Sequence, residues 1–494
     1  MVLHGTPESF ASVIIPQGCM PCHGAARRPS CWVTRVPICA KITRLRIGVG
    51  MTFLGKALGG DSADSAQERW IFGLVLGLVG LALFVLPFGT GAFFPLAALS
   101  LAGLVLIALR LPGLWAERWI RWALLLLLAL WVPQLVSLTV AVDFDRALRT
   151  ALTYPLFAIA ILPLLWVARR RDVATPLLYV VLALAVFWSL DAVFQFVAGA
   201  NVLGYPYNGR RIDGLFHPNM RLGIVLAHLL PFVLEASRRL ASRNRLAAVL
   251  PLIVVIAILL SGSRAAMLAT LITLVAYGAF LIWFYRLRIR TVSAFALVLV
   301  LGVALALWVS PETRDRLVVI SKMSEFSLEG LDQATAKRGT IWLASWRVAM
   351  DEPILGVGVR GVEPVAEARG YSDMPFAHIH LYFLDVLVST GAVGLFAYLA
   401  ALLGILSALW RRAREHGAVD SPDVLVAGVA IFVALNPINV HWTVYSSYTT
   451  AVLWLVVALA LAPLIQSSNQ RPVPERGGEG MGERTGPGAG GHQE

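Results

Sequence analysis

Residues 70–88 read WIFGLVLGLVGLALFVLPF and carry no charged side chain. A helix of this length covers the hydrocarbon core of a bilayer, which is roughly 30 Å thick, so the stretch predicts a transmembrane helix. The same pattern recurs along the chain and predicts about twelve spans. They fall near 70–88, 92–111, 121–140, 150–168, 176–199, 222–237, 246–262, 265–285, 291–310, 381–409, 423–440 and 447–466.

The composition excludes a soluble globular fold. Of the 494 residues, 58% are hydrophobic and 14% are charged, whereas soluble domains carry about 25% charged residues. The net charge of +12 raises the question of nucleic acid, but the basic residues stand in small clusters between apolar runs. That spacing is typical of membrane topology signals, so no nucleic-acid partner is expected. The sequence therefore predicts an all-α integral membrane protein that has membrane lipid as its solvent.

Arginines mark one set of loops more heavily than the other, and this bias predicts the orientation. The heavily marked loops hold Arg110, Arg118, Arg121, Arg169, Arg170, Arg171, Arg238, Arg239, Arg243, Arg245, Arg286, Arg288, Arg290, Arg411, Arg412 and Arg414. The alternate short loops hold Arg146, Arg149, Arg210, Arg211, Arg221 and Arg264. Because positive residues are retained in the cytoplasm, both termini are predicted to be cytoplasmic, which an even number of spans also requires.

The chain divides into four regions. Residues 1–69 are an N-terminal extension and cytoplasmic segment, expected to be largely disordered, and residues 70–466 form the transmembrane domain. The long loop 311–380 lies within that domain, on the side opposite the arginine-rich loops. Residues 467–494 are rich in Gly, Pro, Glu and Arg, so we expect a disordered cytoplasmic tail.

The N-terminal extension contains Cys19, Cys22 and His23 at the spacing of a c-type haem attachment motif. Residues 1–18 lack a convincing signal peptide, so nothing is expected to carry the motif to a compartment where haem is attached. We therefore expect no cofactor there, and interpret residues 1–50 as a disordered or wrongly assigned extension.

The middle of the long loop, Thr340 to Met350, has apolar residues at helical spacing next to Arg338. This pattern predicts an amphipathic helix. Pro353 and the glycines after it end the helix, and the chain then returns to the membrane. We expect the loop to form a lid or platform at the membrane face.

The arginines on the outer side oppose the topology signal, so they need another reason to be there. Guanidinium groups bind phosphate oxygens with paired donors, which suits a phosphorylated lipid. Arg264 follows Ser263 in a short turn between two apolar spans, where an unpaired charge is costly. The alternative is an interfacial arginine that reaches lipid headgroups.

A second candidate group lies in the loop around residues 208–221. It comprises Arg210, Arg211, His217 and Asn219, and two glycines and a proline shape the loop so that its backbone can approach a ligand. An ordinary solvated turn is the alternative.

His378 and His380 stand where the long loop re-enters the membrane. No third or fourth ligand is evident near them, so no metal is expected. A neutral imidazole can take a proton from a hydroxyl group at neutral pH, which makes one of these histidines a candidate general base. A hydrogen-bonded interfacial histidine is the alternative.

These segments resemble the O-antigen ligase and O-antigen polymerase superfamily of bacterial envelope proteins. The likeness covers residues 200–400 in detail, and the hydropathy pattern extends it to 70–466. The matching segments are Gly214–Asn219, Ser261–Arg264, Arg338–Trp342 and Pro353–Gly358. In the ligase branch a histidine precedes two glycines at fixed spacing, and Gly391 and Gly394 select His380 over His378. Leu381 departs from that branch, which usually has Asn, Ser or Gln there.

The resemblance implies a GT-C-like fold in the bacterial inner membrane and a metal-independent, inverting glycosyl transfer at the periplasmic face. The donor would be a polysaccharide on undecaprenyl pyrophosphate, and the acceptor a sugar hydroxyl of lipid A-core. His380, Arg264 and Arg338 would be catalytic. Arg211, Arg210, His217, Asn219, His378 and Ser263 would bind substrate. The alternatives are an O-antigen or exopolysaccharide polymerase, a periplasmic protein O-oligosaccharyltransferase, and a transporter or flippase. The sequence does not indicate an oligomeric state.

Overall fold

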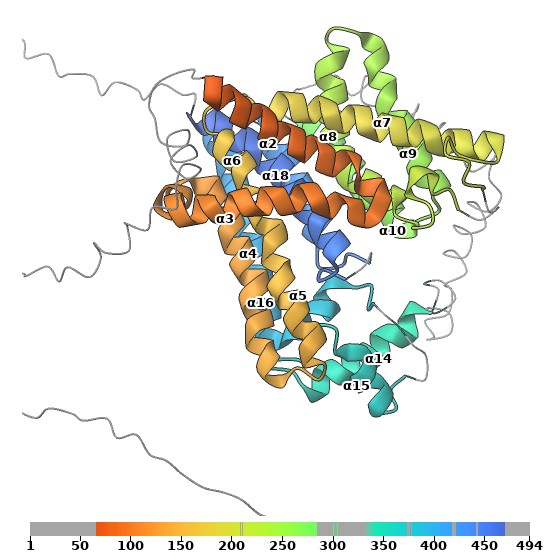
Figure 1. The fold of residues 1–494 in the computed structure, drawn as a ribbon. Coiled ribbons are helices and arrows are strands. Elements are labelled where there is room, and N and C mark those ends of the chain that lie inside the picture. Colours follow the sequence, from red (N-terminus) through yellow and green to blue (C-terminus); the bar gives the residue numbers. More distant parts are fainter. Residues whose placement is uncertain are drawn as a thin grey trace, which may run out of the picture. The chain divides into compact units, whose positions relative to one another are not determined.

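A computed structural model gives the fold of the protein (Figure 1). It describes residues 66–207, 209, 211–283, 300, 304, 332, 335, 337–372, 376, 378–416, 421–440 and 443–469. Every element named in these residues is a helix, and their one isolated β-bridge joins Ala200 and Pro206. The predicted haem motif, Arg210 and the predicted span 291–310 lie outside the described residues.

The helices follow one another along the chain with short connections. They are α2 (Ala66–Phe84), η2 (Leu86–Ala92), α3 (Phe93–Ala116), α4 (Arg118–Ser137), η3 (Leu138–Val140), α5 (Phe144–Ile159), α6 (Leu162–Val167), α7 (Ala174–Ala198), η4 (Gly214–Phe216), α8 (Leu222–Ala241), η5 (Arg245–Val249), α9 (Leu250–Leu260), α10 (Arg264–Trp283), α14 (Arg338–Asp351), α15 (Val362–Ala368), α16 (Tyr382–His416), α17 (Ser421–Leu435) and α18 (Ser447–Asn469).

Seven helical segments in the described residues are long and apolar enough to cross a membrane. They are Leu86–Ala116, Arg118–Val140, Phe144–Val167, Ala174–Ala198, Arg264–Ile282, Tyr382–Glu415 and Ser447–Ser467. Two shorter apolar helical segments, Arg245–Leu260 and Pro422–Leu435, accompany them. The predicted class, an all-α integral membrane protein, is confirmed. The number of twelve spans stays a prediction.

Helix α18 is the most buried of these segments. Within its apolar window, 94% of the residues are buried, compared with 61% for the next most buried segment. It packs against α4, α5, α6, α7, α8 and α17. A helix that is apolar on all faces is stable only when neighbours cover it on all sides, which is the position that α18 takes.

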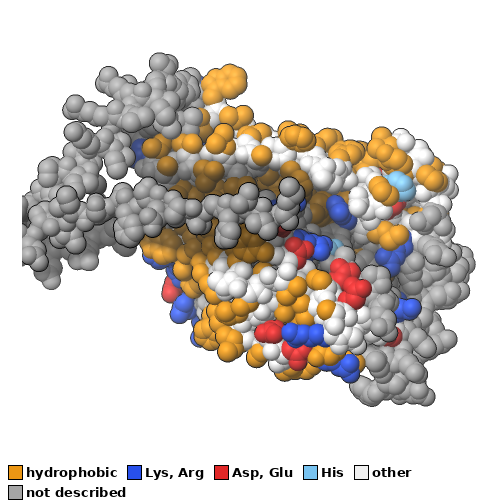
Figure 2. Space-filling model, turned by 60° about the horizontal axis from the view of Figure 1, so that its bottom comes forward, with side chains coloured by type: hydrophobic (Ala, Val, Ile, Leu, Met, Phe, Trp, Pro, Cys, Tyr) orange, Lys and Arg blue, Asp and Glu red, His pale blue; other side chains and the backbone are white. Residues whose placement is uncertain are grey.

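Helices α14 and α15 lie together, apart from the long helices (Figure 1). Their hydrophobic contacts include Ile341, Val348, Val365 and Ile379. The predicted helix in the long loop is therefore confirmed as α14, but it is only weakly amphipathic. Its exposed side also carries large apolar side chains, including Trp346. In Figure 2, charged side chains gather on one part of the surface, beside a broad hydrophobic area.

The glycine-rich segment after α14 is locked into a kink of α16. The backbone N–H of Val357 donates to the Val388 carbonyl at 2.9 Å, and that of Ala392 donates to the Pro353 carbonyl at 2.7 Å. At the kink, Gly391 has φ +67°, and a Cβ there would lie 1.9 Å from the Ile354 oxygen. Only glycine fits this conformation and this close approach. The spacing from His380 to Gly391 therefore has a packing reason.

Candidate functional site

The loop between α17 and α18 ties the start of α16 to the start of α14. The backbone N–H of Tyr382 donates to the Asn439 carbonyl at 3.1 Å. The next carbonyl in that loop, of Val440, accepts a hydrogen bond from Nη1 of Arg338 at 2.9 Å. His380, two residues before Tyr382, and Arg338 are thus held near each other by two consecutive loop residues. The sequence gave no sign of this contact, because the loop carries no charge and no recognised motif.

Three of the predicted arginines converge. Arg338 is largely buried, and burial is the main cause of a pKa below the usual value for arginine. The next causes are the positive charges of Arg264 and Arg211, which lower the pKa further. These three residues, from α14, from the start of α10 and from the loop before η4, form what we call the arginine cluster.

Within the arginine cluster, Arg264 has an unused hydrogen-bond donor. Its Nη1 atom is buried and has no hydrogen-bond partner in the described part of the chain. Buried polar groups in folded proteins nearly always have a partner, so such an atom is typical of a position that meets a ligand. Ser263, the residue before it, uses its hydroxyl oxygen to accept from the Ala266 N–H at 3.4 Å, at the start of α10.

Close packing places the Arg211 segment beside the Arg264 turn. The backbone N–H of Ile212 donates to the Leu260 carbonyl at 3.4 Å. Gly223, at the start of α8, lies so close to Ser261 that a Cβ there would be 2.1 Å from the serine hydroxyl. Two loops that are about fifty residues apart in sequence are therefore neighbours in the fold.

The remaining predicted residues of the first loop make contacts that shape the loop. Nδ1 of His217 lies 2.9 Å from Asp213 Oδ2, and its ring stacks on Tyr205 with centroids 4.7 Å apart. The amide of Gln195 bonds Asp213 as well, so these side chains form a network. The backbone of Asn219 bonds to Phe216. The geometry gives His217 a part in holding the loop, which its sequence position did not indicate.

The two histidines lie on an extended segment beside α14. The indole N–H of Trp342 donates to the Ile379 carbonyl at 2.9 Å, which fixes the segment between them. The rings of His378 and His380 are nearly perpendicular, with centroids 5.9 Å apart. Both are partly exposed. No group of three His, Cys, Asp or Glu side chains in the described residues has the arrangement of a metal site.

Arg360 is a residue of this site that sequence reasoning missed. Its Nη1 lies 3.1 Å from Nδ1 of His378. Burial lowers its pKa; the carboxylate of Asp385 opposes this effect, and the charge of Arg146 adds to it. Its place directly after the Gly356–Gly358 pair is the one signal that marked it in the sequence.

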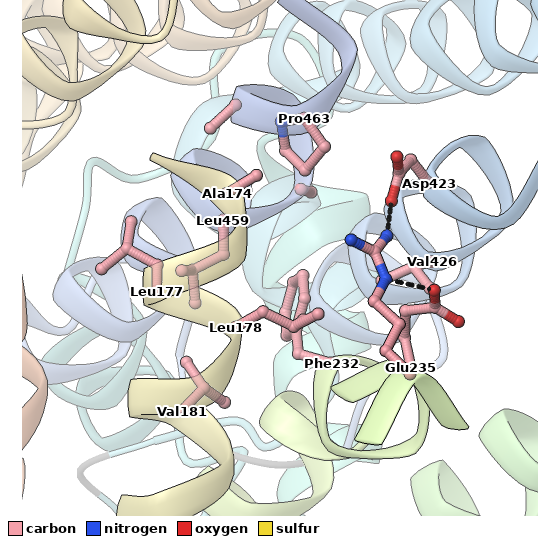
Figure 3. Close-up of a pocket in the computed structure, with 13 residues that line it drawn as sticks. Ala174, Leu177, Leu178, Val181, Phe232, Glu235, Asp423, Val426, Leu459 and Pro463 are labelled. Atoms are coloured by element: carbon pink, nitrogen blue, oxygen red, sulfur yellow. Dashed lines mark hydrogen bonds and ion pairs between the residues drawn. The ribbon is translucent and has the colours of Figure 1, made fainter. Parts of the chain in front are cut away.

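A second group of charges lies elsewhere in the fold, and its members are paired. Arg239 donates to Glu235 at 2.7 Å and to Asp423 at 2.5 Å, and Arg238 donates to Glu235 at 2.7 Å. We call these four residues the charge-paired network. It borders a pocket lined mainly by apolar residues of α7, α8, α17 and α18 (Figure 3). Along α8, Glu235 lies about 18 Å from Gly223, at 1.5 Å per residue.

Comparison with known proteins adds one finding. No curated protein matches the chain. Residues 246–399 match the family model described as O-Antigen ligase, and this range includes Arg264, Arg338, His378 and His380. Arg211 lies before it. The chain thus carries an O-antigen ligase domain over residues 246–399, which supports its place in the O-antigen ligase and polymerase superfamily.

Proposed function

We propose that the protein is an O-antigen ligase of the bacterial inner membrane. It transfers a polysaccharide from undecaprenyl pyrophosphate to a sugar hydroxyl of lipid A-core, at the periplasmic face of a GT-C-like fold. The observation that carries the proposal is the arginine cluster, in which Arg338 is buried beside two further cations. Such an arrangement is unfavourable in an empty protein and favourable around a diphosphate, because phosphate oxygens accept hydrogen bonds and neutralise the charges.

The leaving group explains why several arginines are needed. As the bond between the anomeric carbon and the phosphate oxygen breaks, its electrons pass to the pyrophosphate, whose negative charge increases. Donors already aimed at that charge lower the barrier, and each is typically worth about 10²–10³ in rate. Arg264 supplies a buried donor, and Arg338 and Arg211 supply the charge around it. This role needs no metal ion or other cofactor.

The acceptor is activated by His380 in this proposal. A neutral imidazole takes the proton of the acceptor hydroxyl, and the oxygen attacks the anomeric carbon from the face opposite the pyrophosphate. The new glycosidic bond forms as the phosphate bond breaks, so the configuration inverts. Undecaprenyl pyrophosphate is released, and the proton remains on His380 until solvent removes it. The hydrogen bonds that bring the starts of α14 and α16 together support this division of roles.

A polymerase is the second candidate, and one residue favours it. Leu381 follows His380, where the ligase branch usually has a small polar residue. A polymerase of this superfamily would use the same donor chemistry, with a second lipid-linked chain as the acceptor.

Deletion of the gene separates the two candidates. Loss of a ligase leaves lipid A-core uncapped while long polymer stays on its lipid carrier. Loss of a polymerase instead gives lipid A-core capped with a single repeat unit. Normal lipopolysaccharide in the deletion strain would rule out both candidates.

A further inference from the structure

The contact between Arg360 and His378 fixes the direction of a hydrogen bond. Nη1 of Arg360 lies 3.1 Å from Nδ1 of His378. Arginine carries only donors and stays protonated, so the guanidinium donates and Nδ1 accepts with its lone pair. A neutral imidazole has one N–H, which must then be on Nε2. A proton on Nδ1 would break this bond and place two cations in contact.

The surrounding backbone holds Arg360 in place. Its φ of +72° is uncommon for a residue other than glycine. Two residues earlier, Gly358 packs so closely on Ala141 that a Cβ would lie 2.6 Å from the Ala141 Cβ. The neighbouring Val357 carbonyl accepts from the Val142 N–H at 3.1 Å. The guanidinium is therefore presented by a segment that is tied to the corner between α4 and α5.

The charged groups around this contact come from several elements. Asp385 on α16 and Arg146 on α5 act on Arg360, and His380 faces the His378 ring. Glu363 on α15 accepts from the Phe376 N–H at 3.0 Å, two residues before His378. The contact with the Nδ1 atom of His378 is made by the one cation, Arg360.

We infer that Arg360 is a positioning residue that keeps His378 neutral with its proton on Nε2, so that His378 acts as a hydrogen-bond donor to a sugar or phosphate oxygen and leaves the role of general base to His380. A base must offer a lone pair, and the one on Nδ1 of His378 is already engaged by Arg360. The assignment of chemical roles rests on the proposed glycosyl transfer. The protonation state does not.

Nitrogen NMR of the full-length protein in lipid nanodiscs, with ¹⁵N-labelled histidine, tests the protonation state directly. The His378 signals are identified by their loss in His378→Gln. We expect Nδ1 without a proton and Nε2 with one, and no second proton as the pH falls from about 8 to about 6, across the ordinary range for histidine. In Arg360→Met the ring should populate both tautomers and gain a proton over that range. Arg360→Lys, which keeps a cationic donor, should restore the wild-type pattern.

A proton on Nδ1 in the wild-type protein would overturn the inference, whatever the protein's activity. So would equal titration of His378 in the wild type and in Arg360→Met. Because this measurement needs no substrate, it stands apart from any failure of the proposed function.

Transfer assays test the division of roles. Glutamine places an N–H close to the position of imidazole Nε2, so His378→Gln should keep transfer within about tenfold of wild type, while His380→Gln should lose about 10²–10⁴, the usual contribution of a general base. If His378→Gln were as inactive as His380→Gln, His378 would be the base and the inference would be wrong. If the wild type itself showed no transfer, the proposed function would fail while the NMR result still decided the tautomer.

Discussion

The arginine cluster and the charge-paired network use the same side chain in opposite ways. In the network, Arg238 and Arg239 donate to the carboxylates of Glu235 and Asp423 at 2.5–2.8 Å. In the cluster, the neighbours that change the pKa of Arg338 are further arginines, and its hydrogen bond goes to a backbone carbonyl. A buried arginine beside carboxylates stabilises a fold, whereas buried arginines beside one another indicate an anionic ligand.

The largest effect is expected from removing Arg338. Arg338→Ala should reduce transfer by at least about 10²–10³, because it deletes a charge that stabilises the leaving pyrophosphate. The measurement is the appearance of polymer on lipid A-core in a deletion strain that carries the variant. Arg243→Ala, which changes an exposed arginine near the charge-paired network, is the matched control and should transfer normally. Full activity of Arg338→Ala would remove Arg338 from the site.

Arg264 sharpens the comparison, since charge and geometry can be varied separately. Arg264→Ala should lose about 10²-fold or more, and Arg264→Lys should recover only part of it, because an ammonium group cannot supply the planar paired donors of a guanidinium. Rates are compared at equal amounts of membrane-inserted protein. If lysine restored full transfer, the buried Nη1 atom would have no special part in the reaction.

Stability should respond in the opposite order. Arg239→Met breaks hydrogen bonds to Glu235 and Asp423, and should lower the free energy of unfolding by about 2 kcal/mol, the cost of losing a buried bond to a charged group. Arg264→Met removes a cation from among cations and should leave stability unchanged or raise it. Thermal unfolding of both variants in detergent provides the measurement. A stability loss in Arg264→Met as large as that in Arg239→Met would mean that the cluster is structural.

The smallest effect is expected for a paired arginine in the same region as the cluster. Arg369 donates to Asp351 at 2.7 Å and to Glu352 at 3.0 Å on the exposed side of α14 and α15. Exposed ion pairs contribute little, so Arg369→Ala should change the transfer rate by less than about twofold. The same assay as for Arg338→Ala applies. A large loss would show that arginines in this region matter regardless of their partners.

The sequence was most informative where the signal is local. Long apolar windows predicted the membrane helices, because a span needs a continuous apolar stretch. Helical spacing predicted α14. The conflict of Arg264 with the orientation rule also pointed to a residue that the fold places in the arginine cluster.

Contacts between distant segments could not be predicted in this way. The bond from Arg338 to Val440 joins residues 102 positions apart. Arg360 meets His378 because the Pro353–Gly358 segment is docked in the kink of α16, and neither partner shows this in its local pattern. The same applies to Gly391, whose spacing from His380 resembles a catalytic motif although the fold uses this glycine for close packing.

Direct binding of a diphosphate is the most decisive test of the account. Undecaprenyl pyrophosphate is titrated against the protein in nanodiscs, for the wild type and for the combined variant Arg211→Ala, Arg264→Ala and Arg338→Ala. The account predicts saturable binding to the wild type and a loss of at least about 100-fold in affinity, or about 2.7 kcal/mol, in the variant. Equal affinity of the two proteins would contradict it, because the arginine cluster would then have no part in holding the donor.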